Sequence, residues 1–297
     1  MDRLPVADPL QAVGVDDLTV VIVTYNSAHC VPALASGLQA IPHVIVVDNA
    51  SNDDTPARVQ EAIPQARVLH NDANLGFGAA NNRALRMVST RYALLLNPDC
   101  LPDAAFFAGI TAAATRFPEA AVIAPHLLRR DGEVELSYRW PATHWTSAGP
   151  GADAPCSVGF VCGAVMLLNM EVMREVGFFD EAFFLYYEDE DLCQRVFLAR
   201  KDIVLVPEVS IAHLSRGSVK GRSPLRSEYL RGYHHAQSKL VFERKYFGRA
   251  AAARLGRTTL MLALLTLLVR LLVPQPRYLA RLVGRIMGLW RTDAARS

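Results

Sequence analysis

The feature of this sequence that most restricts its fold is an alternation of short apolar runs, rich in β-branched residues, with segments of helix length. The apolar runs read as buried strands, and segments of helix length, such as 54–62 and 76–88, lie between them. Such strands are typical of a parallel sheet covered on both faces, and a strand–helix–strand series builds a doubly wound α/β sheet. The runs are "TVVIVT" (19–24), "HVIVVD" (43–48), "ARVLH" (66–70), "YALLLN" (92–97) and "AAVIAP" (120–125).

The pattern changes after residue 126. The elements expected there are a hairpin at Asp131-Gly132, a loop over 141–157, a strand over 159–169, a helix from Glu188 to about Lys201, one or two strands over 203–213, a basic Gly/Ser-rich loop over 214–226 and helices from 225 onward. We therefore expect an N-terminal extension (1–18), an α/β domain (19–224) with a mostly parallel sheet, and a C-terminal helical segment (225–297).

Composition and charge narrow the class of protein. The 297 residues are 51% hydrophobic and 20% charged, which indicates a globular chain with room for one large domain or two ordinary ones. Residues 1–219 have a net charge of −11, and residues 220–297 have a net charge of +13. The basic end suggests an anionic partner, either nucleic acid or anionic lipid. Five cysteines without a C-x-x-C pair read as reduced thiols, and the N-terminus has no apolar signal region, so we expect a cytosolic protein.

Polar clusters follow three of the predicted strands. Ligands of doubly wound sheets bind beyond the carboxyl ends of the strands, where Asp48 could accept the N–H of a nucleobase. The alternative is a helix-capping loop, because Ser51, Asp53 and Asp54 are all good capping residues. The clusters are Thr24-Tyr25-Asn26, Asp48-Asn49 and Asn97-Pro98-Asp99.

A glycine pair in "NLGFGAANN" would let the backbone approach a phosphate or a ribose. Gly76, Gly78 and Asn81 resemble a dinucleotide fingerprint, and Asp99 follows Gly78 by 21 residues. However, Asn81 stands where the third glycine belongs, and the motif follows the third strand and not the first. A dinucleotide site is therefore disfavoured.

Two further patterns suggest chemistry. Asp99 and His213 each end a predicted strand and together could hold a divalent cation, although a structural carboxylate and a surface histidine are the simpler interpretation of each. In "FFLYYEDEDLCQR", four consecutive acids from Glu188 to Asp191 follow an aromatic run. They are either a solvated helix start, favoured by the helix dipole, or include an acid held beside an apolar wall for proton chemistry.

Taken together, seven motifs in this order resemble the family 2 glycosyltransferases, in particular the rhamnosyltransferase-like branch that builds surface polysaccharides. The resemblance covers about residues 19–247. It implies the GT-A (nucleotide-diphospho-sugar transferase) fold, a nucleotide-sugar donor, a divalent metal and inversion at the anomeric carbon. The motifs are "VVIVTYNS", "VIVVDNASNDDT", "NLGFGAANN", "LLLNPD", "CGAVML", "FFLYYEDEDLCQR" and "AHLSRGS".

The resemblance also implies roles for individual residues. Asp99 and His213 match metal ligands, but Asn97 stands where the family's D-x-D motif has its first acid, so the donor's diphosphate and water must complete the shell. Oxygen-rich coordination suits Mg²⁺, and one imidazole makes Mn²⁺ a candidate as well. The residues that would meet the donor are Thr24, Tyr25, Asn26, Asp48, Asn74, Gly76, Asn81 and Asn97.

For the acceptor, Asp189 matches the catalytic base, Glu188 would bind acceptor hydroxyls, and Tyr187 would stack on a sugar face. Burial beside the aromatic run would raise the proton affinity of Asp189 toward a useful range. The basic residues Arg216, Lys220 and Arg222 could close over the diphosphate as a lid, or form a solvated linker.

From the apolar and basic residues of the C-terminal segment, we predict contact with the cytoplasmic face of a membrane. The apolar stretch 258–273 has 16 residues, fewer than the roughly 20 that span a bilayer, and 277–291 places Arg277, Arg281 and Arg285 on one helical face. This is the pattern of an interfacial helix on an anionic leaflet, with no nucleic-acid role. The alternative is packing on the catalytic domain or a homo-oligomer seam.

The expected function is transfer of L-rhamnose from dTDP-rhamnose to a saccharide or lipid-linked saccharide acceptor, with the sugar resting on the resemblance alone. Two alternatives stay open. A sugar-1-phosphate nucleotidyltransferase would need a Gly-rich basic loop after the first strand, and "VTYNSAHC" is not one. A non-catalytic, membrane-bound homologue would explain Asn97, but Asp99, Asp189 and His213 argue against it.

Overall fold

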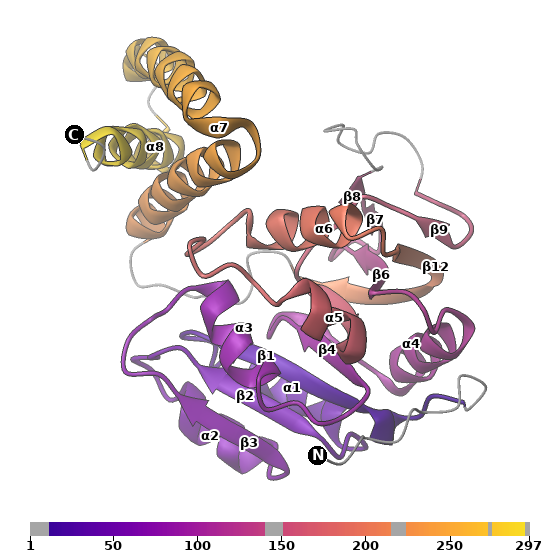
Figure 1. Ribbon diagram of the computed structural model, residues 1–297. Helices are drawn as coiled ribbons and strands as arrows, with labels where there is room; N and C mark the ends of the chain where they lie inside the picture. Colours follow the sequence, from indigo (N-terminus) through magenta and orange to yellow (C-terminus); the bar gives the residue numbers. More distant parts are fainter. Residues whose placement is uncertain (1–11, 140–150, 215–223, 273–274, 295–297) are drawn as a thin grey trace. The chain divides into compact units, whose positions relative to one another are not determined.

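The computed structural model describes residues 12–139, 151–214, 224–272 and 275–294 (Figure 1). The residues suggested as a lid, Arg216, Lys220 and Arg222, lie outside the described residues, as does most of the N-terminal extension. The described residues form two compact units. The first comprises 1–74, 80–178 and 192–219, and the second comprises 75–79, 179–191 and 220–297.

The first unit is built on one mixed sheet with the strand order β3-β2-β1-β4-β11-β6-β12-β5. The short strands β7 (Val134–Glu135) and β9 (Cys156–Ser157) pair with β6 and β12, and β8 (Tyr138–Arg139) pairs with β10 (Phe160–Val161) in a separate ribbon. The strands of the main order are β1 (Leu18–Thr24), β2 (Val44–Asp48), β3 (Ala66–His70), β4 (Tyr92–Leu96), β5 (Cys100–Leu101), β6 (Val122–Leu128), β11 (Val165–Asn169) and β12 (Ile203–His213).

The five strands predicted between residues 19 and 125 are confirmed, and β11 and β5 are where the main strand order departs from a simple parallel series. β1 pairs in parallel with β2 and β4, and β12 pairs in parallel with β6. Between β4 and β6, β11 runs antiparallel to both. Of the strand expected over 159–169, only the second half joins the main sheet, because Cys162 N–H donates to Ser137 O in the ribbon at 2.9 Å and the chain then turns at Gly163.

Apolar residues on both faces of the central strands are buried. Val20 and Ile22 of β1 belong to the main core, and Val21, which alternates with them, is also fully buried. Because neighbouring side chains of a strand point to opposite faces, both faces are covered, as the continuous apolar runs predict.

The helices of the first unit begin with standard signals. Asp103 caps α4 by accepting from Phe106 N–H at 2.7 Å, and Asn169 caps α5 by accepting from Glu171 N–H at 3.2 Å. The helices are α1 (Val31–Leu38), α2 (Thr55–Ala62), α3 (Phe77–Leu85), α4 (Ala104–Arg116), α5 (Met170–Val176) and α6 (Glu188–Leu198), of which α3 and α6 have their first residues in the second unit.

The second unit contains the C-terminal helices α7 (Pro224–Leu272) and α8 (Pro276–Ala294). Gly248 interrupts α7 with φ 86°, a left-handed conformation that glycine adopts without steric cost, so α7 consists of two helices, 224–247 and 249–272. Among the described helices, α7 is long and apolar enough by composition to cross a membrane, and little of its apolar stretch is buried.

Glycines set the close contact between α8 and the first half of α7. A Cβ at Gly284 would lie 1.9 Å from Tyr229 O, and one at Gly288 would lie 2.4 Å from Tyr233 O. Because Tyr229 and Tyr233 meet Gly284 and Gly288 in the same order, the two helices run in the same direction along this contact. A side chain at either glycine would push the backbones apart.

We therefore expect Gly284→Ala to destabilise the protein by about 1–3 kcal/mol, the usual cost of overpacking. The matched control is Gly256→Ala in α7, where the new Cβ would lie 3.5 Å from Leu240 Cδ2, an ordinary contact. This control should be neutral or gain up to about 1 kcal/mol, because alanine favours the helix. Thermal unfolding of both variants checks the prediction, and equal effects would contradict it.

Candidate functional site

Thr24 and Asp48 end the neighbouring strands β1 and β2 in register. Both are buried, and Thr24 Oγ1 donates to Asp48 Oδ1 at 3.2 Å. The other carboxylate oxygen, Asp48 Oδ2, accepts from Ser51 N–H at 3.0 Å. The carboxylate is therefore fixed at the end of the sheet, where the sequence placed it.

The two loops that follow these strands are joined by side-chain hydrogen bonds. Asn26, with φ 53°, donates its N–H to Ser51 Oγ at 2.9 Å, and its side-chain oxygen accepts from Asn52 N–H at 2.8 Å. Tyr25 N–H donates to Ser27 Oγ at 3.2 Å. Asp54, at the N-cap of α2, makes no side-chain cap bond. The loop 49–54 thus holds Asn26, and its Asp53 also accepts from Thr55 N–H at the start of α2, at 3.1 Å.

A chain of amides supports Asn74 and includes residues that the sequence analysis missed. Asn49 Nδ2 donates to Asn74 Oδ1 at 2.9 Å, and Asn71 Nδ2 donates to Asn49 Oδ1 at 2.9 Å. Arg83 Nη1 in turn contacts Asn71 Oδ1. Asn81, also predicted for the donor site, is buried in α3. Asn49 belonged to a quoted strand-end cluster, but no sequence pattern pointed to Asn71 or Arg83.

Asn97, Pro98 and Asp99 form a turn between β4 and β5. Asn97 N–H donates to Ala164 O at 2.9 Å, and Asn97 O accepts from Cys100 N–H at 3.0 Å. The Asp99 side chain is 2% exposed, and its Oδ1 lies 3.7 Å from His213 Nε2. His213 reaches this position because it pairs with Cys100 at the end of β12. The two residues that the sequence proposed as metal ligands are therefore neighbours.

Glu135 is a third member of this cluster that the sequence analysis missed. Its Oε2 lies 3.3 Å from His213 Nδ1, on the opposite side of the ring from Asp99. The sequence does contain a signal for the position of Glu135. The hairpin expected at Asp131-Gly132 brings β7 back alongside β6, so that Glu135 pairs with Leu127.

The cluster offers a carboxylate and an imidazole nitrogen to a divalent cation, with a second carboxylate holding the ring. A carboxylate on the distal nitrogen is how proteins commonly orient a metal-binding histidine. Among the described residues, no group of three or more His, Cys, Asp and Glu side chains has the arrangement of a complete metal site. An ion held by Asp99 and His213 would therefore need further ligands from outside this cluster.

The second unit holds the loop that leads into the four acids. Tyr186 and Tyr187 have φ 68° and 67°, a conformation that costs a non-glycine residue about 1–3 kcal/mol. Phe77 N–H donates to Phe184 O at 3.0 Å, and a Cβ at Gly76 would lie 2.2 Å from that same oxygen. Gly76, predicted for the donor site, thus has a packing role in this loop.

The first half of α7 holds this loop through side chains. Ser238 Oγ donates to Leu185 O at 2.9 Å, and the ring of His234 stacks on Phe184 with 4.3 Å between centroids. His235 contacts both Tyr186 and Tyr187, at 5.6 Å and 5.5 Å. Burial lowers the pKa of both histidines, which are neutral partners for these rings.

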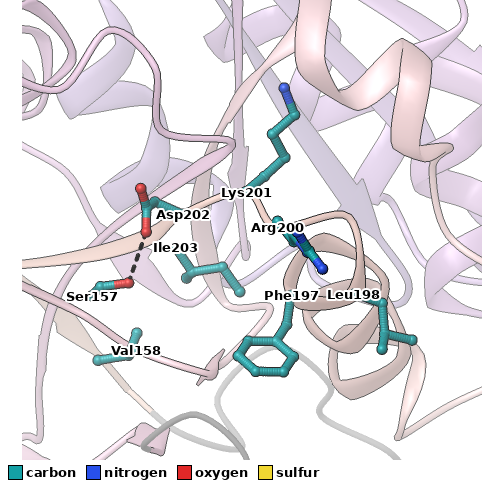
Figure 2. Close-up of a pocket in the computed structure, with 8 residues that line it drawn as sticks. All are labelled: Ser157, Val158, Phe197, Leu198, Arg200, Lys201, Asp202 and Ile203. Carbon is teal, nitrogen blue, oxygen red and sulfur yellow. Dashed lines mark hydrogen bonds between the residues drawn. The ribbon is translucent and has the colours of Figure 1, made fainter.

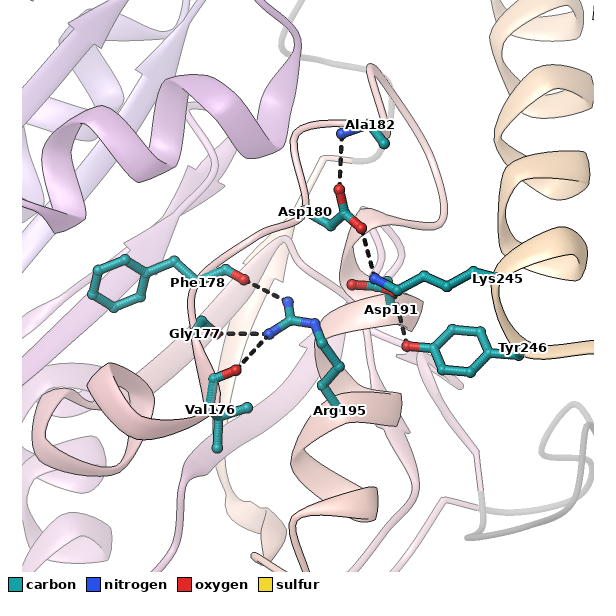
Figure 3. A network of polar contacts seen from close by, with 9 residues as sticks. All are labelled: Val176, Gly177, Phe178, Asp180, Ala182, Asp191, Arg195, Lys245 and Tyr246. Atoms are coloured by element: carbon teal, nitrogen blue, oxygen red, sulfur yellow. Dashed lines mark hydrogen bonds and ion pairs between the residues drawn. The ribbon is translucent and has the colours of Figure 1, made fainter.

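A buried ion pair connects α7 to the start of α6. The Asp191 side chain is fully buried, Lys245 Nζ lies 2.6 Å from its Oδ1, and Tyr246 Oη donates to the same atom at 2.8 Å. Lys245 also pairs with Asp180 at 2.6 Å. Figure 3 shows Lys245 and Tyr246 directed at Asp191. Asp191 is therefore committed to structure, and the acids left for chemistry precede it.

Glu188 and Asp189 occupy different environments. Glu188 is 6% exposed, and its Oε2 has no hydrogen-bond partner among the described residues. Burial raises the pKa of Glu188 well above its ordinary value of 4.5, and the charge of Asp189 raises it further. Asp189 is half-buried, and its Oδ1 accepts from Glu190 N–H at 2.9 Å. The burial that the sequence analysis expected for Asp189 thus occurs at Glu188.

A surface pocket of about 540 Å³ in the first unit lies away from these groups (Figure 2). It includes Ile203, the first residue of β12, and a hydrogen bond of 3.0 Å from Ser157 Oγ to Asp202 Oδ1. His213 ends the same strand, roughly 30 Å further along at the usual rise per residue. Because ligands of such sheets bind at the carboxyl ends of the strands, this pocket is not the candidate site.

The known proteins that this chain resembles in sequence and in fold are glycosyltransferases. Residues 19–177 match the sequence model of Glycosyl transferase family 2. The chain is similar to the N-acetylglucosaminyl-diphospho-decaprenol L-rhamnosyltransferase of Mycobacterium tuberculosis, at 30% identity over 254 residues that cover 74% of this chain and 82% of that protein. It is also similar to the low-salt glycan biosynthesis hexosyltransferase Agl10 of Haloferax volcanii, at 24% identity over 233 residues that cover 74% and 73%.

Among solved structures, the mannosyltransferase PcManGT of Pyrobaculum calidifontis, in complex with GDP-Man and Mn²⁺, superposes with a TM-score of 0.57. The two chains are 16% identical, and the match covers 96% of this chain and 89% of that one. This likeness establishes the GT-A fold with its C-terminal helical extension, as the sequence predicted.

The burial of Glu188 predicts a pH dependence of stability. Its folded pKa is raised, so between about pH 4.5 and that higher value the folded protein binds more protons than the unfolded chain. Stability should therefore fall as the pH rises through this window, and the always neutral Glu188→Gln should remove that part of the fall. Urea unfolding from about pH 4 to about pH 9 checks this. The two proteins should agree best at the acidic end, and an unchanged slope in the variant would contradict the prediction.

Proposed function

Because this chain belongs to Glycosyl transferase family 2, we propose that it is an inverting transferase that moves a sugar from a nucleoside-diphosphate donor to a hydroxyl of a lipid-linked saccharide. The observation that carries the proposal is the meeting of Asp99 and His213 at the strand ends, 3.7 Å apart. The donor binds along Thr24, Asp48 and the amide chain that ends at Asn74.

A divalent metal fits the donor site. Asp99 and His213 would hold it, with Glu135 fixing the ring of His213 through its Nδ1. When bound, the metal offsets the negative charge that develops on the leaving diphosphate. Mn²⁺ in the PcManGT complex supports a divalent ion of this class, and Mg²⁺ suits the same oxygen-rich shell.

Asp189 is the base in this proposal. The acceptor oxygen attacks the anomeric carbon from the face opposite the diphosphate, the bond to the diphosphate oxygen breaks with its electron pair, and Asp189 takes the hydroxyl proton. Such proton transfer contributes about 10²- to 10⁴-fold to the rate. Glu188, which is buried and has a raised pKa, hydrogen-bonds a hydroxyl of the acceptor, and Tyr187 stacks on the acceptor's sugar face.

The identity of the sugar rests on the relatives. The mycobacterial protein is an L-rhamnosyltransferase by name, and its acceptor is N-acetylglucosaminyl-diphospho-decaprenol. We therefore propose that the donor is dTDP-L-rhamnose and that the acceptor is a sugar linked to a prenyl diphosphate. The place of the reaction would be surface-polysaccharide assembly in the cell envelope.

An acceptor of this kind confines the enzyme to a membrane. In the second half of α7 the apolar side chains between Met261 and Leu272 are largely exposed, Leu268 at 63% and Leu272 at 83%. The segment from residue 220 onward carries 16 basic residues against 3 acidic ones. These features support a peripheral association with the anionic cytoplasmic leaflet.

A transfer assay with dTDP-rhamnose and a short-chain lipid-linked acceptor tests the function. Asp189→Asn should lower kcat by at least about 10²-fold while donor affinity stays near that of the wild type. In contrast, Asp99→Ala should weaken Mn²⁺-dependent donor binding, because it removes a ligand and not the base.

Three results would count against this proposal. Near-normal turnover of Asp189→Asn would move the base to another acid. If EDTA leaves wild-type donor binding and transfer unchanged, the metal assignment fails. A wild-type protein that binds donors but transfers nothing would favour the non-catalytic homologue.

The membrane proposal predicts that full-length protein pellets with anionic liposomes at low salt. The double variant Leu265→Glu/Leu268→Glu should stay in the supernatant, since it places charges on the exposed apolar surface. Leu198→Glu, which alters an equally exposed leucine on α6, is the matched control and should pellet normally. If the double variant also pellets, the C-terminal segment does not carry the association.

A further inference from the structure

A small cavity in the second unit combines basic and apolar walls. It has a volume of about 80 Å³ and lies where the two halves of α7 meet α8. Its polar walls are His235 and Lys239 from the first half of α7, Thr259 from the second half and Arg285 from α8. Leu240 and Leu289 close its apolar side. The volume is that of two or three water molecules in the liquid, which suits one tetrahedral anion and excludes a nucleoside.

Lys239 and Arg285 of this cavity differ from other cations of the same helices, which pair with an acid. Elsewhere on the same helices, Arg231 and Arg281 both pair with Glu228, at 2.9 Å and 3.0 Å. In the described part of the chain, no carboxylate lies within ion-pairing distance of Lys239 or Arg285. The pKa of His235 is lowered by burial and then by Arg285 and Lys239, so the imidazole adds a neutral hydrogen-bonding group. Two uncompensated positive charges beside a hydroxyl form a site for an anion with several oxygens.

We propose that this cavity binds a phosphate of the lipid-linked acceptor, with Lys239 and Arg285 as its charged contacts and Thr259 and His235 as its polar ones. The assignment rests on the proposed function for the acceptor's chemistry.

A neighbouring apolar surface favours a prenyl diphosphate over a free phosphate as the ligand. The exposed apolar surface of α7 begins directly after Thr259, where Met261 and Leu262 are 56% and 58% exposed. An amphipathic ligand can therefore place its head in the cavity and its chain along the helix. A free phosphate would gain nothing from this apolar surface.

The cavity also adjoins the residues that lead to the acids. His235, which lines it, contacts Tyr187 with 5.5 Å between ring centroids, and Tyr187 directly precedes Glu188. A sugar attached to the bound diphosphate would thus lie beside the loop that carries Glu188 and Asp189. The cavity positions the acceptor, whereas the acids act on its hydroxyl.

The test compares two acceptors in detergent: N-acetylglucosamine linked to a short-chain prenyl diphosphate, and an alkyl N-acetylglucosaminide that lacks phosphate. Lys239→Gln and Arg285→Gln should each raise the acceptor KM about 10-fold for the diphosphate acceptor, the effect of losing one charge-assisted contact. Their kcat, their donor KM and their KM for the alkyl acceptor should stay at wild-type values. Lys239→Arg should restore most of the loss.

Arg254→Gln is the matched control, because Arg254 is an exposed cation on α7 outside the cavity, and it should behave as the wild type. A KM that rises equally for both acceptors would show a general structural role and overturn the inference. An unchanged KM for the diphosphate acceptor would overturn it as well.

Calorimetry with farnesyl diphosphate in EDTA separates this inference from the proposed function. The wild type should bind this probe, and Lys239→Gln and Arg285→Gln should lose about 10-fold in affinity, whether or not any sugar is transferred. If the variants lose affinity in this way but the wild type transfers no sugar, the proposed function is wrong and the assignment of the cavity stands. If the wild type and the variants bind the probe equally, the assignment of the cavity is wrong. If inorganic phosphate binds as tightly as farnesyl diphosphate, the site takes free phosphate and the lipid assignment is wrong.

Discussion

The parallel register of β1, β2 and β4 is the constraint on which the proposed donor site depends. Because these strands point the same way, their last residues meet at one edge of the sheet, and Thr24 lies against Asp48. The turn after β4 adds Asn97 and Asp99 at the same edge. None of these polar groups could be held there by local structure alone. Close packing of the buried side chains on both faces of these strands holds the register.

The proposed acceptor site depends on a different interaction, the packing of α7 against the loop 179–191. That loop contains two consecutive tyrosines in a strained left-handed conformation. Stacking of His234 on Phe184, the Ser238 hydrogen bond to Leu185 and the burial of Asp191 with Lys245 and Tyr246 offset this strain. A buried carboxylate is costly unless it is paired and hydrogen-bonded, and Asp191 is both. The C-terminal helices thus shape the loop that presents Glu188 and Asp189.

The four consecutive acids at the start of α6 divide into different roles by environment. Asp191 is neutralised by Lys245, Glu188 is buried without a hydrogen-bond partner for Oε2 among the described residues, and Asp189 is half-buried. Placing unlike environments side by side limits the repulsion that four equal charges would create, because burial raises the pKa of Glu188 and so favours its uncharged form. The helix dipole favours negative charge at this position, which helps the remaining acids.

The apolar periodicity of the sequence by itself located the strands of the sheet, and the polar residues that follow them located the strand ends. Its resemblance to the family 2 glycosyltransferases indicated the GT-A fold and the pairing of Asp99 with His213. The sequence also located the exposed basic and apolar C-terminal helices, which amphipathic spacing encodes. Only the tertiary structure decided that β11 runs antiparallel between β4 and β6, that Glu135 faces His213 and that Gly76 packs on Phe184. It likewise decided that the buried acid beside the aromatic run, whose Oε2 has no hydrogen-bond partner among the described residues, is Glu188 and not Asp189. These features come from contacts between residues far apart in the chain, and the repeat of a helix or strand carries no information about which distant surface will cover a given side chain.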